Sequence, residues 1–203
     1  ADDARALAVL GATGYLADGF SGVRVLSLSV PSAPAAVGAV RGSSRVRATA
    51  ADGHLLCAAA GTEGVNLYTL TNAAHPVWLG AFTNALNACD TAVRSNLLVV
   101  ADGQFGLHAV DVSSPAAPVL LGTYQPANMH MLRTVKMLGG LAAVCDGYRI
   151  ELLDLTAPHA PVPIASFSTN VFIYGLALAS NHLYAAGGGL GVFRPDEIGP
   201  AAE

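Results

Sequence analysis

The sequence predicts an all-β fold built from repeated units of about 42 residues. Three observations lead to this prediction: a proline hexad that recurs along the chain, a glycine that recurs with nearly the same spacing, and short apolar runs bounded by turn residues. No segment shows the sustained 3.6-residue periodicity that is typical of an amphipathic helix. No apolar stretch reaches the roughly 18 residues that a membrane-spanning helix needs, so we expect no membrane insertion.

The hexad has the pattern Ser/Thr-x-Pro/Ala-x-x-Pro. Its copies are SVPSAP (29–34), TNAAHP (71–76), SSPAAP (113–118) and TAPHAP (156–161), and their closing prolines are spaced by 42, 42 and 43 residues. An apolar run follows each copy, as in VLLGTY after Pro118. Because proline has no N–H to donate to a sheet, each closing proline is expected at the connection between the third and fourth strands of a unit.

The recurring glycine ends a short strand-like segment, such as VVADG at 99–103. Its five copies are Gly19, Gly61, Gly103, Gly147 and Gly188, with spacings of 42, 42, 44 and 41 residues. Two independent landmarks therefore give one period. They divide a single domain into five units, at approximately 4–45, 46–87, 88–130, 131–174 and 175–203.

The third unit shows the expected strands most clearly. They are DTAVRS (90–95), LLVVADG (97–103), GLHAVDV (106–112) and PVLLGTY (118–124). Four short strands in a unit of this length correspond to one blade of a β-propeller, so we predict a propeller of five blades. The innermost strands would line a central channel. Leucine-rich and helical repeats do not fit, and the signatures of WD40 blades are absent.

The fifth unit departs from the pattern. If Gly191 is aligned with Gly106, then PAAE (200–203) falls on PAAP (115–118), and no residues remain for a fourth strand. We therefore expect the last blade to lack its outer strand. Gly191, Val192, Phe193 and Arg194 would form an open edge that pairs with another protein chain or with a neighbouring copy. Alternatively, a longer chain would supply the strand.

Two segments carry a family resemblance. VVADGQFGLHAVDVSSPAAPVLLG (99–122) and CDGYRIELLDLTAPHAP (145–161) resemble repeats of the LVIVD β-propeller family, although Ser27 and Thr69 stand where that family has Asp. The resemblance implies a propeller exported by bacteria or archaea, and therefore an extracellular, cell-surface or periplasmic location. It transfers no catalytic residue to this chain.

A column of cationic residues is the main candidate site. Counting back from the landmark glycines gives Arg5, Arg47, Cys89, Arg133 and Tyr174 at the start of the innermost strands. Guanidinium groups suit carboxylate or phosphate, so Arg5, Arg47, Arg133 and Tyr174 are candidate ligand-binding residues in the channel. The alternative is that the arginines pair with Asp90 or with backbone carbonyls and only fill the channel.

The acidic residues do not suggest catalysis. Propeller glycosidases need paired carboxylates around one bond, and the expected innermost strands hold almost none. Asp18, Asp102 and Asp146 share one repeated turn position, and Asp111 and Asp154 share another, which indicates that they cap turns. We therefore expect a non-enzymatic protein-binding scaffold or assembly subunit. The alternative is a propeller that binds a small anion, or a hydrolase, with its site in the channel.

Composition limits the other classes. Net charge is −4, and ten Lys and Arg residues are spread thinly, so we expect no binding to nucleic acid. Cys57, Cys89 and Cys145 form no CxxC motif and are interpreted as small core residues. The segment NMHM (128–131) contains soft ligands, but the histidines show no metal spacing. We therefore predict no metal site and no cofactor.

Overall fold

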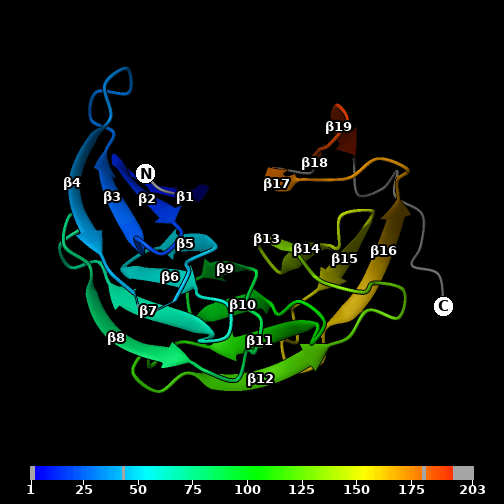
Figure 1. Cartoon of the computed structure of the whole chain (residues 1–203). Helices are drawn as coiled ribbons and strands as arrows, with labels where there is room; N and C mark the ends of the chain where they lie inside the picture. The colour runs from blue at the N-terminus through cyan, green and yellow to red at the C-terminus, as the bar shows by residue number, and fades with distance from the viewer. Residues whose placement is uncertain (1–2, 43, 180–181, 194–203) are drawn as a thin grey trace.

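A computed structural model of the chain describes residues 3–42, 44–179 and 182–193. These residues form five antiparallel sheets arranged around one axis as the blades of a β-propeller (Figure 1). The predicted fold class is therefore confirmed. No helix within the described ranges is long and apolar enough to cross a membrane.

In each blade the strands follow chain order from the channel outwards. Blade 1 contains β1 (Ala4–Leu10), β2 (Thr13–Asp18), β3 (Val23–Ser27) and β4 (Ala35–Val40). Blade 2 contains β5 (Ala48–Asp52), β6 (Leu55–Ala59), β7 (Val65–Thr69) and β8 (Val77–Phe82). Blade 3 contains β9 (Asp90–Arg94), β10 (Leu97–Ala101), β11 (Leu107–Asp111) and β12 (Val119–Tyr124).

Blade 4 contains β13 (Thr134–Leu138), β14 (Leu141–Cys145), β15 (Arg149–Asp154) and β16 (Val162–Ser168). Blade 5 contains β17 (Gly175–Ala179), β18 (His182–Ala186) and β19 (Leu190–Phe193). In the described part of the chain the last blade thus has three strands, as predicted, whereas the other blades have four.

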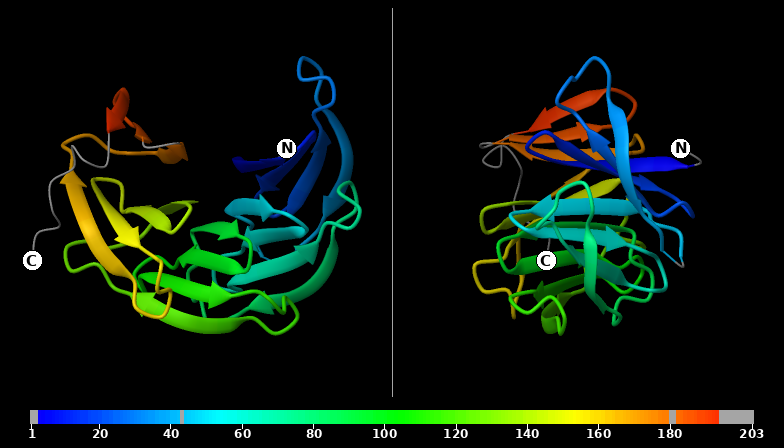
Figure 2. Two further views of the ribbon diagram at one scale, coloured as in Figure 1. Left: turned by 180° about the vertical axis from the view of Figure 1, so that it is seen from behind. Right: turned by 90° about the vertical axis from the view of Figure 1, so that its left-hand side faces the viewer.

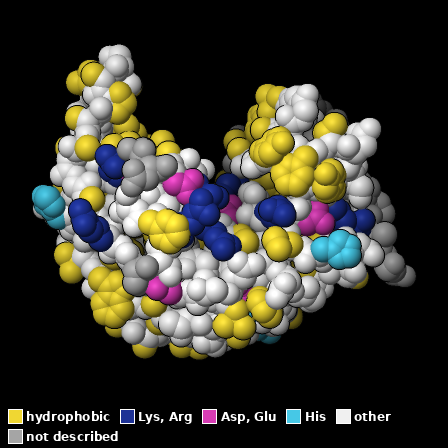
Figure 3. Space-filling model, viewed as in Figure 1, with side chains coloured by type: hydrophobic (Ala, Val, Ile, Leu, Met, Phe, Trp, Pro, Cys, Tyr) yellow, Lys and Arg dark blue, Asp and Glu magenta, His cyan; other side chains and the backbone are white. Residues whose placement is uncertain are grey.

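The blades form an open arc rather than a closed ring. The innermost strands β1, β5, β9, β13 and β17 lie side by side in that order. Blades 1 and 5, at the two ends of this row, face each other across an opening (Figures 1 and 2). The opening persists as a deep notch when side chains are drawn in full (Figure 3). The channel expected from the sequence is therefore open on one side.

The proline hexads form the same turn in every complete blade. Equivalent backbone bonds close it, for example from Ala33 N to Val30 O at 2.9 Å and from Ala117 N to Ser114 O at 2.9 Å. The closing proline then stands directly before the fourth strand, as Pro34 does before β4. The prediction for these prolines is confirmed, because a residue without an N–H is tolerated where pairing has not yet begun.

Glycines in the outer strands allow the hexad of the next blade to approach. A Cβ atom on Gly80 of β8 would lie 2.6 Å from the carbonyl oxygen of Pro115, and one on Gly122 of β12 would lie 2.5 Å from that of His159. Any larger side chain would push these backbones apart. Contact between blades thus explains the glycines in the runs after the first three hexads, namely Gly38, Gly80 and Gly122.

The core consists of apolar layers between successive blades rather than one central cluster. Each layer combines buried residues of two neighbouring sheets, such as Leu67 of blade 2 with Leu98 of blade 3. The landmark glycines tie the same neighbours together, because Gly61 and Ala88 exchange backbone bonds of 3.0 and 3.2 Å. Gly61 has φ +60°, a conformation that side chains rarely adopt.

Candidate functional site: a cationic cavity and two apolar end faces

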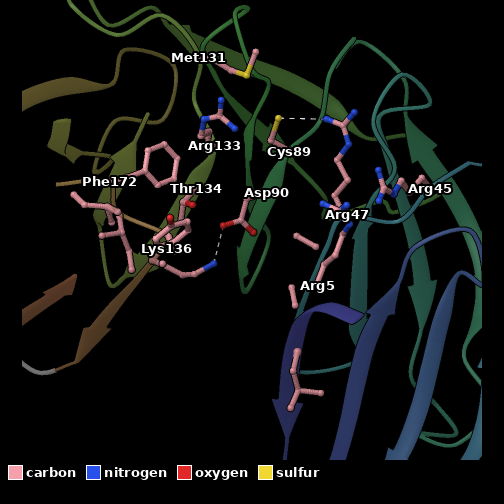
Figure 4. Close-up of a pocket in the computed structure, with 17 residues that line it drawn as sticks. Arg5, Arg45, Arg47, Cys89, Asp90, Met131, Arg133, Thr134, Lys136 and Phe172 are labelled. Carbon is pink, nitrogen blue, oxygen red and sulfur yellow. Dashed lines mark hydrogen bonds and ion pairs between the residues drawn. The ribbon is translucent and has the colours of Figure 1, made fainter. Parts of the chain in front are cut away.

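A cavity of about 740 Å³ lies where the innermost strands begin (Figure 4). The whole predicted column lines it: Arg5, Arg47, Cys89, Arg133 and Tyr174. The repeat therefore brings residues of five blades to one place, as equal spacing from the glycines requires. Cationic side chains gather at the centre of the molecule, below the notch (Figure 3). Whether these residues bind a ligand stays a prediction.

Two of the cavity arginines share one carboxylate. Arg5 Nε donates to Asp3 Oδ2 at 2.9 Å, and Arg45 Nε donates to the same oxygen at 2.8 Å. Hydrogen bonds from Arg5 and Arg45 hold the pKa of Asp3 below its usual value. The charges of these two arginines are thus partly compensated.

Asp90, the acid proposed as a partner for the arginines, is bonded elsewhere. Its Oδ2 accepts from Lys136 Nζ at 2.8 Å and from the backbone N–H of Val135 at 3.0 Å (Figure 4). Both donors belong to β13 of the next blade. The interpretation of the arginines as partners of Asp90 is therefore wrong. The carboxylate is buried and ties blade 3 to blade 4.

Arg47 and Arg133 lie on either side of Cys89 (Figure 4). Arg47 Nη1 donates to Asn87 Oδ1 at 2.7 Å and to Cys89 Sγ at 3.4 Å. Arg133 places its guanidinium 5.7 Å from the centre of the Phe172 ring. Within residues 3–42, 44–179 and 182–193, neither arginine has a carboxylate partner.

Tyr174 contributes less to the cavity than its alignment suggests. Its side chain is 78% exposed, and its ring lies 4.9 Å from that of Phe172. Phe172 is the aromatic residue that contacts Arg133, and the glycine spacing does not select it. Equal spacing from the landmark glycines predicts which backbone position begins the strand. It does not predict which nearby aromatic side chain points into the cavity.

The interpretation of the cysteines as small core residues is correct for Cys57 and Cys145 but not for Cys89. These two are 0% and 1% exposed, whereas Cys89 lines the cavity. Burial raises the pKa of the Cys89 thiol, and the nearby charges of Arg47 and Arg133 partly offset this effect. Among the described residues, no group of three or more His, Cys, Asp and Glu is placed to hold a metal ion.

The repeated aspartates do not all cap their own turns. Asp146 does, accepting from Tyr148 N at 2.8 Å. Asp102 instead accepts from Leu86 N at 3.0 Å and from Asn87 N, both in the connection that precedes its blade. Asp102 is 0% exposed, so its oxygens face the preceding connection rather than solvent. For Asp102 the turn-capping interpretation is wrong.

The bonding of Asp18 resembles that of Asp102 rather than that of Asp146, because its carboxylate also binds groups outside its own turn. It accepts from Asp3 N at 3.1 Å and from Arg24 Nη2 at 2.8 Å. By contrast, Asp111 and Asp154 bond the following turn as predicted, since each accepts a backbone N–H from two residues ahead, from Ser113 and Thr156 respectively.

Blade 1 exposes an apolar sheet face to the opening. Leu7 and Val9 of β1 are 50% and 54% exposed. On the same face, Leu16 of β2 occupies the position of Val100 in blade 3, which is fully buried against blade 2. The face has the composition of a blade interface, but no preceding blade covers it among the described residues.

Blade 5 exposes the corresponding face on the other side of the opening. Leu190 and Val192 of β19 are 70% and 50% exposed, and both lie on the face of Tyr184 and Ala186. The alternate residues, such as Leu183, are buried against blade 4. Of the predicted partner edge, Gly191, Val192 and Phe193 form the outermost described strand of this blade, and Arg194 lies outside the described residues.

The alignment of Gly191 with Gly106 is displaced by two residues. Leu190 pairs with Ala186 as Leu107 pairs with Ala101 in blade 3. The reason is a shorter turn: residues 187–189 connect β18 to β19, whereas residues 102–106 connect β10 to β11. A sequence alignment on glycine alone does not detect this difference.

Solved structures of several propellers share this fold. The Cps50 (Swd1) β-propeller domain from Myceliophteria thermophila matches with a TM-score of 0.73 and 14% identity, over 97% of this chain and 70% of that chain. Sqt1 of Saccharomyces cerevisiae matches with a TM-score of 0.72 and 9% identity, over 98% and 60%. The computationally designed Ika8 protein matches with 0.68 and 9% identity, over 93% and 57%.

The fold and the blade interfaces thus define a β-propeller. The chain spans less than two thirds of the length of Sqt1 and of Ika8. Residues 86–126, which contain blade 3, match the LVIVD repeat. The chain is thus a β-propeller whose third blade matches the LVIVD repeat. Comparison with curated proteins gives no match.

Proposed function

We propose that this chain is a non-enzymatic, exported scaffold whose protein partner fills the opening between blades 1 and 5. One observation carries the proposal: both terminal blades expose the apolar face that every internal blade buries against its neighbour. Large exposed apolar surfaces mark sites of association. Export is expected from the resemblance of the repeats to those of exported LVIVD proteins.

The chemistry of the two faces indicates the kind of partner. Leu7 and Val9 on one side, and Leu190 and Val192 on the other, continue the pattern of the interfaces between blades. The surface that fits them is another twisted antiparallel sheet with an apolar face. We therefore propose that the partner supplies propeller blades, with one apolar sheet for each side of the opening.

A second copy of the chain fits the opening less well than a shorter partner. Propellers that match this fold have a further 30 to 43% of their length outside the matched part, since the matches cover 57, 70 and 60% of those chains. For blades of similar size, the opening has room for about two or three of them. A second copy would bring five.

The proposal is tested by extending the chain with its own blades. A copy of residues 46–130 is appended after Glu203, and hydrogen exchange is measured at Tyr184–Val192 in the extended and original chains. The control extension carries Leu56→Asp and Tyr68→Asp in the appended copy, at residues that pack in the layer between blades 1 and 2. We expect slower exchange and a higher melting temperature with the intact extension only.

Two outcomes would overturn the proposal. One is equal exchange in the original chain and in both extended chains, because the appended blades would then not pack against the exposed face of blade 5. The other is a homodimer, detected by light scattering, in which the original chain already protects Tyr184–Val192. In that case a second copy would be the occupant.

A further inference from the structure

We infer that the inner cavity binds a small organic oxyanion, a phosphate ester or a carboxylate, between Arg47 and Arg133. This inference goes beyond the scaffold function and does not depend on it. The two arginines come from blades 2 and 4, and Cys89 of blade 3 lies between them (Figure 4). The site is therefore complete within one chain.

The balance of charge in the cavity favours an anion. Five cationic side chains line it, namely Arg5, Arg45, Arg47, Arg133 and Lys136, but Asp90 is the one carboxylate among its lining residues. Asp3 partly compensates Arg5 and Arg45, and Asp90 compensates Lys136. The charges of Arg47 and Arg133 remain, and a concave site concentrates their field.

Arg47 is held in place before any ligand arrives. Its Nη1 donates to Asn87 Oδ1 at 2.7 Å, and its guanidinium lies against Gly61, where a Cβ atom would be 3.4 Å from Nη2. Nε and Nη2 make no bond within the described ranges. A guanidinium fixed by one nitrogen presents the others in the fork geometry that suits an oxyanion.

Arg133 is oriented by an aromatic ring rather than by an acid. Phe172 lies 5.7 Å from its guanidinium carbon and interacts with the cation. A ring supports the cation without neutralising it and without accepting its N–H groups. Arg133 is also exposed and lines the cavity, so its donors are accessible to a dissolved ligand.

The remaining walls indicate a ligand with an apolar part. Met131 and Phe172 line the cavity near Arg133 (Figure 4), and Ile173 and Leu176 also belong to its lining. Cys89 carries a neutral thiol at ordinary pH because burial raises its pKa, so it does not repel an anion. A small organic phosphate or carboxylate matches this combination better than a bare inorganic ion.

Calorimetry at low ionic strength tests the inference, with phenyl phosphate and benzoate as probes. Arg47→Gln and Arg133→Gln should each weaken binding about tenfold or more, since each removes a charged hydrogen-bond donor. Arg94→Gln is the matched control, because Arg94 is exposed at the far end of β9 and outside the cavity lining. It makes the same change in net charge and should bind as the original protein does.

A second readout follows occupation of the site directly. Bound anion should slow the reaction of the Cys89 thiol with N-ethylmaleimide, measured by peptide mass spectrometry. Preference for phenyl phosphate or for benzoate assigns the ligand class. The inference is overturned if neither probe binds or protects Cys89, or if Arg94→Gln weakens binding as much as the cavity variants do.

Discussion

Nε2 of His108 lies 2.8 Å from Oδ2 of Asp102, and both side chains are buried. Asp102 also accepts the backbone N–H groups of Leu86 and Asn87, so one carboxylate joins β11 to the connection between blades 2 and 3. His108 in turn packs edge-on against Phe82 of blade 2, with ring centres 5.9 Å apart. This polar junction stabilises the packing of successive blades.

Asp102→Ala should therefore lower the free energy of unfolding by about 1–3 kcal/mol, because it leaves partly buried donors without an acceptor. The measurement is urea denaturation followed by circular dichroism. Asp111→Ala is the control in the same blade, since the Asp111 carboxylate accepts from Ser113 in an exposed turn, and should change stability by less than about 1 kcal/mol. Equal effects of the two substitutions would show that Asp102 does not join the blades.

Gly80→Ala should destabilise the protein by about 1–3 kcal/mol, because the new Cβ would lie 2.6 Å from the carbonyl oxygen of Pro115. Gly175→Ala in β17 provides the comparison, since no atom lies within 4 Å of its Cβ position. That substitution should be neutral or slightly stabilising. Thermal melting of both variants distinguishes the effects, and similar losses would contradict the proposed contact between outer strand and hexad.

Leu152→Ala should cost about 2–5 kcal/mol, because Leu152 is 1% exposed in the layer between blades 4 and 5. Leu190→Ala removes the same atoms from the open face of blade 5, where the side chain is 70% exposed. Its cost should stay within about 0.5 kcal/mol. A large loss of stability in Leu190→Ala, measured by denaturant titration, would mean that this face is covered in the isolated chain.

Asp3 should make a small pH-dependent contribution to stability. Its pKa in the folded protein is lowered by hydrogen bonds from Arg5 and Arg45, so the stabilisation is present above the usual value of 3.8. It is lost as pH falls through the folded pKa, where the carboxylate takes up a proton. The difference in melting temperature between the original protein and Asp3→Asn should therefore disappear in acid. A difference that is constant from neutral pH to pH 2 would contradict this coupling.

The three thiols should differ strongly in reactivity. Burial raises the pKa of Cys145 to about 11, and raises that of the fully buried Cys57 further. At pH 8, N-ethylmaleimide should modify Cys89 in the folded protein, and should modify Cys57 and Cys145 only after unfolding. Mass spectrometry of proteolytic peptides provides the measurement. Rapid modification of Cys57 in the folded protein would place it outside the core.

Much of the architecture could be predicted from the sequence, because each unit repeats the same local chemistry. The closing prolines mark the connection before the fourth strand, since a missing N–H acts within a few residues. Equal spacing from the landmark glycines placed Arg5, Arg47 and Arg133 at equivalent positions, and in the structure they line one cavity. Asp111 and Asp154 bond their own turns, which is again a local interaction.

The tertiary structure decided what depends on contacts between units. Asp102 binds the preceding connection and Asp90 binds the following blade, because a buried carboxylate bonds whichever donors the neighbouring sheet brings within reach. Cys89 faces the cavity although Cys57 and Cys145, also in apolar segments, are buried in the core.

The opening between blades 1 and 5 is likewise a property of the assembled sheets. The sequence by itself determined five units and four strands in each complete unit, because periodicity and turn chemistry are local. Closure depends on the small rotation between neighbouring blades, summed along the arc. That rotation is set by side-chain packing in the layers between blades, such as the contacts of Leu67 and Leu98, and no single repeat encodes it.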